Sequence, residues 1–252
     1  MGTYAMKPTF STTAGGGVKA ASIEFDTIGY YFARCMEDLQ LITDVLGLPA
    51  EESIKKIPPK EARVGFVKSL FWSSAGSGTI AAMEKAAETL LMRQRLTDIF
   101  KVTSVTDSGV SGHKDYLLDT TRMMLDPAVR AFVDGALKYP REEVRQAFDY
   151  YAAVRPALDK IAARSYALKP PSAIDEASLG LGDMGSPIFN SVWTAARMPV
   201  IQVPASAGPN AMPVGLSLVV RTYCDQYLLS IATILAEALM KEGGWQKKLV
   251  HD

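Results

Sequence analysis

The sequence contains few cysteines and few histidines, two of each in 252 residues. The two thiols, Cys35 and Cys224, are too few for a disulfide scaffold, which needs more cysteines in a shorter chain. His113 has no Cys, His or Glu nearby at the spacing of a zinc site, and His251 lies at the terminus. We therefore expect ordinary thiols in a reducing compartment and no metal site.

The sequence also lacks an excess of charge and a long apolar run. Lysine plus arginine and aspartate plus glutamate number 27 each, so the formal net charge is zero. A neutral chain without a basic block does not have the charge pattern of nucleic-acid-binding proteins. No apolar run reaches the length of a membrane span, and residues 1–10 lack the apolar core of a signal peptide. These absences favour a cytoplasmic protein that binds no nucleic acid and spans no membrane.

The hydrophobic residues, 48% of the chain, follow alternating helical and extended patterns. Apolar residues at helical spacing, with caps and stop signals, predict helices over 31–46, 77–95, from about 126, from about 140, 187–197 and 224–240. Alternating or β-branched stretches predict strands over 62–68, 99–105, 200–203 and 214–220, with extended chain around 7–13. Strand, helix and strand over 62–105 suggest a βαβ unit, so we expect one α/β domain over residues 1–252.

Short motifs of known type occur near the start of the chain. Residues 6–10 read MKPTF, residues 25–29 read FDTIG, and Arg34 and Asp38 follow. Residues 63–66 read RVGF and open the middle section. These segments resemble, in the same order, the "K-P-T" segment, the "l-D-t-v-G" segment and the middle strand of the amidase signature family.

The last third carries the stronger part of this resemblance. Residues 182–194 read GDMGSPIFNSVWT and are similar to the family's "G-D, F-N, W-T" stretch. Residues 198–204, MPVIQVP, resemble its "P-a-v-s-v-P" strand. Residues 212–219, MPVGLSLV, resemble its "l-P-v-G-l-Q-l-v" strand, and Asp225 with a long helix follows. The matches run in order over most of the chain, so coincidence is an unsatisfactory explanation.

The resemblance implies a fold and a chemistry. The implied fold class is α/β, with a mixed β-sheet covered by helices on both faces. The implied activity is hydrolysis of carbon–nitrogen bonds in small-molecule amides, without a metal or an organic cofactor. In the family a serine attacks the carbonyl, a second serine relays its proton to a lysine, and a glycine- and serine-rich loop binds the oxyanion. A serine needs such a base because its hydroxyl is a weak nucleophile.

The family's catalytic groups precede the K-P-T segment, whereas only six residues, none a serine, precede Lys7 here. We therefore assign no catalytic residue and expect the N-terminal part of the fold to be missing. The resulting hypothesis is a truncated, inactive amidase, a pseudoenzyme that self-associates through an incomplete sheet. The alternative is a stand-alone, non-catalytic binding or partner protein derived from an amidase.

Five matched residues are candidates for a substrate pocket that would take a small-molecule amide: Asp26, Thr27, Asn190, Trp193 and Thr194. Asp26 has an equally good structural role, since aspartate in a turn bonds nearby backbone amides. Trp193 on a short helix is also suited to the hydrophobic core.

Ser77 offers a different reading. It lies in SSAGSG, residues 73–78, after a predicted strand and before a predicted helix, where an oxyanion loop could form. Its position after the K-P-T segment favours a helix cap instead, and the spacing does not fit a Gly-x-Ser-x-Gly elbow. An unrelated hydrolase that uses Ser77 stays open, as does a triad of His113 with Asp115 or Asp119.

The segment before the G-D stretch departs from the family pattern. Residues 167–175 keep Pro171 and Ser172 but show no clear β-run before them. We therefore expect a central strand that is broken or poorly formed.

Overall fold

The computed structural model describes residues 2–10, 12–13, 31–48, 64–67, 70–90, 140–163, 167–180, 182, 185–186 and 188–245. Within these ranges the strands are β1 (Tyr4–Lys7), β2 (Tyr31–Ala33), β3 (Val64–Phe66), β4 (Ala167–Lys169), β5 (Val200–Ala207) and β6 (Pro213–Val219). The helices are α1 (Met36–Val45), α2 (Ser77–Leu90), α6 (Arg141–Ala162), α7 (Ile188–Ala195) and α8 (Asp225–Lys241), with a 3-10 turn over Leu70–Ser74.

The described strands form one mixed sheet in the order β2-β1-β5-β6-β4-β3. β3 and β4 run parallel, and the other neighbouring strands run antiparallel. The β5–β6 hairpin is the longest pairing, from Val200 opposite Val219 to Ala207 opposite Pro213, with an irregularity between Pro204 and Ser206. It lies at the centre of the sheet, so the short strands on either side are aligned by it.

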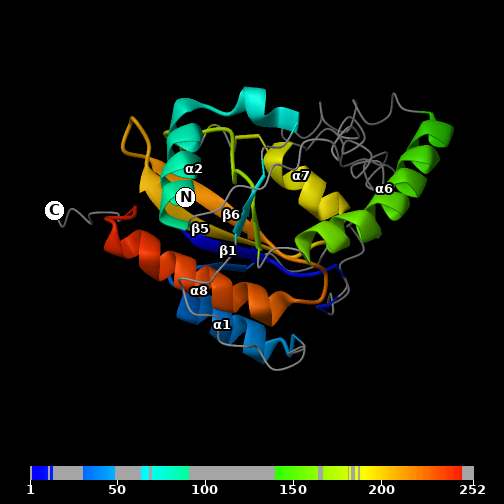
Figure 1. The fold of residues 1–252 in the computed structure, drawn as a ribbon, viewed down its shortest axis with the longest axis horizontal. Coiled ribbons are helices and arrows are strands. Elements are labelled where there is room, and N and C mark those ends of the chain that lie inside the picture. The colour runs from blue at the N-terminus through cyan, green and yellow to red at the C-terminus, as the bar shows by residue number, and fades with distance from the viewer. Residues whose placement is uncertain are drawn as a thin grey trace, which may run out of the picture.

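Helices cover both faces of the sheet. On one face α1, α2 and α8 enclose a core that includes Ile201 and Leu218. On the other face α6 and α7 enclose a second core that includes Val200 and Val219. Figure 1 shows α1 and α8 side by side along one side of the sheet, with α7 and α6 on the opposite side. This arrangement confirms the α/β fold class with a mixed sheet and two helical layers.

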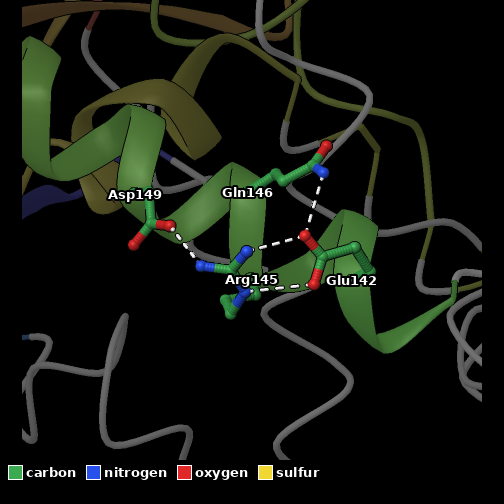
Figure 2. Close-up of polar contacts among 4 residues, drawn as sticks. All are labelled: Glu142, Arg145, Gln146 and Asp149. Carbon is green, nitrogen blue, oxygen red and sulfur yellow. Dashed lines mark hydrogen bonds and ion pairs between the residues drawn. The ribbon is translucent and has the colours of Figure 1, made fainter.

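α6 carries an exposed polar network on its solvent side (Figure 2). The Arg145 guanidinium binds both carboxylate oxygens of Glu142 and also reaches Asp149, with closest N–O distances of 2.6 and 3.1 Å. The Gln146 amide donates to the same Glu142 carboxylate at 3.1 Å. Because these groups are solvated and their charges screened, we assign the network a local role in the helix. No helix in the described ranges has both the length and the apolar character needed to cross a bilayer.

Several predicted elements are confirmed with small shifts. Strand β3 lies inside the predicted 62–68, α6 begins one residue after Pro140, and α7, β5, β6 and α8 occupy their predicted places. Helix α2 begins at Ser77 as predicted and is described to Leu90. The strand predicted over 99–105 and the helix predicted from about 126 lie outside the described residues, so the βαβ unit stays a prediction.

Two predictions near the N-terminus are wrong. The extended stretch lies at Tyr4–Lys7 rather than over 7–13. The helix expected over 31–46 begins only at Met36, because residues 31–33 form strand β2. The apolar spacing was compatible with a helix, but Tyr31 and Phe32 are also good strand residues. Pairing of β2 with β1 decides between the two structures.

Strand β4 is short, as the sequence indicates, yet it is fully buried between β6 and β3. The ladder to β6 continues as an isolated bridge between Pro171 and Leu216. Pro170 and Pro171 have no backbone N–H to donate, which limits the strand to three residues.

Lys169, the last residue of β4, is a buried cation in the core shared with α2. It is 2% exposed, and its Nζ donates to the backbone oxygen of Met83 at 2.9 Å. Burial lowers the pKa of Lys169 to about 7, because the charged form loses its hydration. The amine is therefore tolerated in the core partly by giving up its proton.

We expect the substitution Lys169→Met to stabilise the protein near pH 7. The folded pKa lies below the unfolded value of 10.5, so the unfolded chain binds more protons between these values. Wild-type stability contributed by this group is therefore complete above pH 10.5 and falls as the pH drops to 7, by up to about 1.4 kcal/mol per pH unit. Chemical denaturation at several pH values measures this slope.

Lys169→Met should remove that slope, so the two proteins converge at high pH. Lys241→Met, at the exposed end of α8, is the matched control and should leave the slope unchanged. A wild-type protein more stable than Lys169→Met at pH 7 would contradict the argument.

Candidate functional site

Three of the five predicted pocket residues lie on α7, in different environments. Asn190 is exposed, Thr194 is half-buried and donates to the Asn190 backbone oxygen at 3.3 Å, and Trp193 is 1% exposed. Trp193 packs in the core with residues of three strands: Leu168, Val200 and Val219. Asp26 and Thr27 lie outside the described residues, so a pocket that combines all five stays a prediction.

Asn190 connects α7 to the chain that follows β4. Its side-chain amide donates to the Ser172 backbone oxygen at 2.7 Å. The hydroxyl of Ser172 lies 2.7 Å from the hydroxyl of Ser217 on β6, and both serines are buried. The sequence patterns did not single out Ser172 or Ser217 as site residues, although both stand inside matched segments. The two serines are 45 residues apart in the sequence, so their contact depends on how the chain after β4 is placed against β6.

The register places two rows of side chains on the sheet face that carries α7. The first row runs across four strands and is buried: Lys7, Val200, Val219 and Leu168. The adjacent row is Phe32, Ala5, Gln202 and Ser217. The first row is mostly apolar and lies under α7. The adjacent row is apolar on β2 and β1, at Phe32 and Ala5, and polar on β5 and β6, at Gln202 and Ser217. Gln202 is half-buried and Phe32 is 62% exposed.

We call Gln202, Ser217, Ser172 and Asn190 the polar row. Gln202 stands directly opposite Ser217 on the neighbouring strand, so its side chain leaves the sheet next to the paired serine hydroxyls. A β-carbon added to Gly215 would come within 2.3 Å of the Gln202 Nε2. The Gln202 carboxamide therefore lies over the backbone of β6 at Gly215. The polar row offers hydrogen-bond donors and acceptors without a charge.

The amine of Lys7, the lysine of the K-P-T segment, is held by backbone oxygens and does not face a serine that it could deprotonate among the described residues. Its Nζ donates to the backbone oxygens of Met198 at 2.6 Å and Pro8 at 3.2 Å. Burial lowers the pKa of Lys7 to about 8, and the charge of Asp225 opposes that shift. Lys7 therefore holds the end of α7 to strand β1.

Asp225 completes this junction at the start of α8. Its carboxylate accepts hydrogen bonds from the Thr9 amide at 2.7 Å and the Thr9 hydroxyl at 2.6 Å. The same hydroxyl accepts from the Tyr223 amide at 2.9 Å. Burial raises the pKa of Asp225, while the bonds from Thr9 and the charge of Lys7 lower it. The K-P-T segment is thus an anchor between two helices.

The loop at Ser77 is organised by a carboxylate from another part of the chain. The Thr79 amide donates to Asp175 Oδ1 at 3.3 Å, and the Thr79 hydroxyl donates to the Ala173 backbone oxygen at 3.1 Å. The predicted cap at Ser77 is therefore wrong, since Asp175 supplies the acceptor for this helix start. Gly76 and Gly78 leave room for the Asp175 carboxylate, because an added β-carbon at either would collide with it. The neighbouring Glu176 accepts from the amides of Asn210 and Met212 in the β5–β6 turn.

Other side chains that could act as nucleophiles or metal ligands do not form a reactive site within the described residues. Cys224 is buried, and its sulfur accepts a hydrogen bond from the Arg221 Nε at 3.0 Å. Within the described ranges no three His, Cys, Asp or Glu side chains are grouped to hold a metal ion. His113, Asp115 and Asp119 lie outside the described residues, so their triad stays a hypothesis.

We expect Thr9→Val to destabilise the protein by about 2 kcal/mol, because a buried carboxylate loses a charge-assisted hydrogen bond and the Tyr223 amide loses its acceptor. Thermal or denaturant unfolding measures the change. Thr3→Val is the control, since Thr3 is half-buried and its hydroxyl has no such partner in the described part of the chain. Equal stability of the two variants would contradict the anchor role.

The sequence and the fold were compared with those of known proteins. The sequence matches no protein-family model and no curated protein. Among solved structures, an amidase aligns with a TM-score of 0.76 at 19% identity, over 94% of this chain and 58% of its own. A protein from a study of a vestigial complex and the origins of an s-triazine catabolic enzyme aligns with a TM-score of 0.76 at 19% identity, over 97% and 60%.

The allophanate hydrolase of Kluyveromyces lactis aligns with a TM-score of 0.73 at 16% identity, over 94% of this chain and 43% of its own. The chain spans about 60% of the length of the amidase and of the s-triazine-related protein. At this identity the likeness concerns the fold. The 252 residues have the fold of amidase-signature enzymes over that part of their length.

Proposed function

We propose that this chain comes from an amidase lineage, whose members hydrolyse carbon–nitrogen bonds in small-molecule amides. The observation that carries the proposal is the mixed sheet with two helical layers, which aligns with an amidase over 94% of the chain. The ordered motifs from Lys7 to Asp225 support it. In the structure these motifs form the junction of β1, α7 and α8.

We further propose that the 252 residues are a truncated form that does not hydrolyse amides by themselves. Lys7 is held by Met198. Lys169 lies in the core on the opposite face of the sheet from the polar row. Among the described residues, Ser77 has no lysine or histidine bonded to its hydroxyl. An attacking serine therefore needs a base that these described groups do not offer.

The purified chain should release no ammonia or amine from simple aliphatic and aryl amides, and a fluorophosphonate probe for activated serines should not label it. Ser77→Ala is the matched variant. Turnover by the chain that Ser77→Ala abolishes would overturn the proposal and identify a hydrolase based on Ser77. Turnover that persists in independent preparations of both proteins would refute inactivity without implicating Ser77.

The endogenous protein distinguishes a piece of an enzyme from an independent protein. An antibody to α8 would recover it for intact-mass analysis and probe labelling. A labelled species well above 27.3 kDa would support a working amidase that contains these residues. A single unlabelled species of 27.3 kDa would favour the alternative, a non-catalytic binding or partner protein derived from an amidase.

We also propose self-association through the sheet edge at β2, and a reducing, cytoplasmic location, which suits the free thiols of Cys35 and Cys224. β2 is one of the two outer strands of the described sheet, and its Phe32 is 62% exposed. The unpaired backbone groups of an outer strand can pair with a strand of another chain. Light scattering should show assemblies heavier than 27.3 kDa. Phe32→Lys should reduce them, whereas Leu179→Lys, at an exposed position away from the strands, should not. A monomer at all concentrations would exclude this association.

A further inference from the structure

Helix α1 carries a group of exposed apolar side chains at the outer boundary of the molecule. Leu41 is 62% exposed, Val45 78% and Leu46 43%. They are three of the seven large hydrophobic side chains that are exposed in the described part of the chain. Figure 1 shows α1 at the lower edge of the view, with no other labelled element beyond it. Single exposed apolar residues need no explanation, whereas a contiguous group is typical of an interaction surface.

The inward face of α1 is sufficient to hold this helix in the fold. Its buried residues are Met36, Leu39 and Thr43. Leu41 and Val45 are four residues apart, so they lie one turn apart on the opposite, outward side of the helix. Neither belongs to the hydrophobic core beneath α1. Polar residues at these two positions would cost the fold little, since exposed side chains contribute little to stability.

The exposed apolar group lies among carboxylates. Glu37, Asp38 and Asp44 are exposed, and the sequence of α1, MEDLQLITDV, contains no lysine or arginine. Glu37 precedes Leu41 by four residues, so this carboxylate continues the apolar row along the outward side of the helix. Arg34, two residues before the helix, is the nearest preceding basic residue in the sequence. The outward side of α1 therefore combines an apolar centre with a predominantly negative border.

Asp44 is the carboxylate that the helix itself does not explain. Acidic residues in a first turn, here Glu37 and Asp38, stabilise a helix through its dipole. Asp44 lies at the other end of α1, where a negative charge opposes the dipole. Its carboxylate accepts a hydrogen bond from the Gln40 amide at 2.8 Å, an exposed contact that adds little stability. A cation supplied by a partner would compensate this charge.

We propose that the outward side of α1 docks a basic amphipathic helix of another protein. Apolar side chains of that helix, three or four residues apart, pack on Leu41 and Val45. Its lysines or arginines lie beside Asp38 and Asp44. A second copy of this chain is a poorer occupant, because two copies of α1 would place carboxylates against carboxylates. The inference is independent of the amide hydrolysis and of the association at β2 proposed above.

Fluorescence anisotropy with the full chain and a labelled peptide tests the proposal. The probe is a peptide of about five helical turns, with leucine along one face and lysine along the other. It should bind about tenfold more tightly than a twin peptide that carries glutamate in place of lysine, and added salt should weaken it. The double variant Leu41→Gln/Val45→Gln should weaken binding of the lysine peptide by about tenfold or more. Leu179→Gln, at an exposed position outside α1, is the matched control and should leave binding unchanged.

Asp44→Asn separates docking from a role within the helix. This variant should bind the lysine peptide more weakly and yet unfold at the same or a higher denaturant concentration, because it removes a charge that opposes the helix dipole. A loss of stability with unchanged peptide binding would show that Asp44 serves the helix, and would contradict the proposed contact.

The same measurements identify other occupants of this surface. Equal binding of the lysine and glutamate peptides, or unchanged binding by a folded Leu41→Gln/Val45→Gln variant, would overturn the inference. A dimer of the chain alone that the double variant abolishes would assign the surface to a second copy. Flotation with phosphatidylcholine vesicles that the double variant abolishes would assign it to a lipid surface. Either result would also overturn the docking of a basic helix.

Discussion

The backbone ladder between β5 and β6 is the constraint on which the rest of the structure depends. It fixes which side chains of the hairpin point to each face of the sheet. Ile201 and Leu218 face α8, whereas Val200 and Val219 face α7. A register slip of one residue would move each set to the wrong face. The hairpin also aligns β1 on one side and β4 on the other. Both cores, the anchor at Lys7 and the polar row therefore follow from a single pairing.

Carboxylates that accept backbone amides fasten the remaining layers to this sheet. Asp225 holds the segment after β1, Asp175 holds the start of α2, and Glu176 holds the β5–β6 turn. Asp159 of α6 binds both the amide and the hydroxyl of Thr222, between β6 and α8. Helix starts and tight turns expose N–H groups, and an anion from a distant segment satisfies them. Each contact links elements that hydrophobic packing alone would leave free to slide.

Local patterns in the sequence predicted much of the fold, and what they missed depends on distant contacts. Apolar spacing and caps located α2, α6, α7 and α8, and β-branched stretches located β5 and β6. Strand β2 was missed because its aromatic residues also fit a helix until β1 supplies a partner. The Ser172–Ser217 contact and the role of Asp175 join segments 45 and 96 residues apart. Of the candidate site, sequence placed Asn190 on a helix but could not bring it to Ser172.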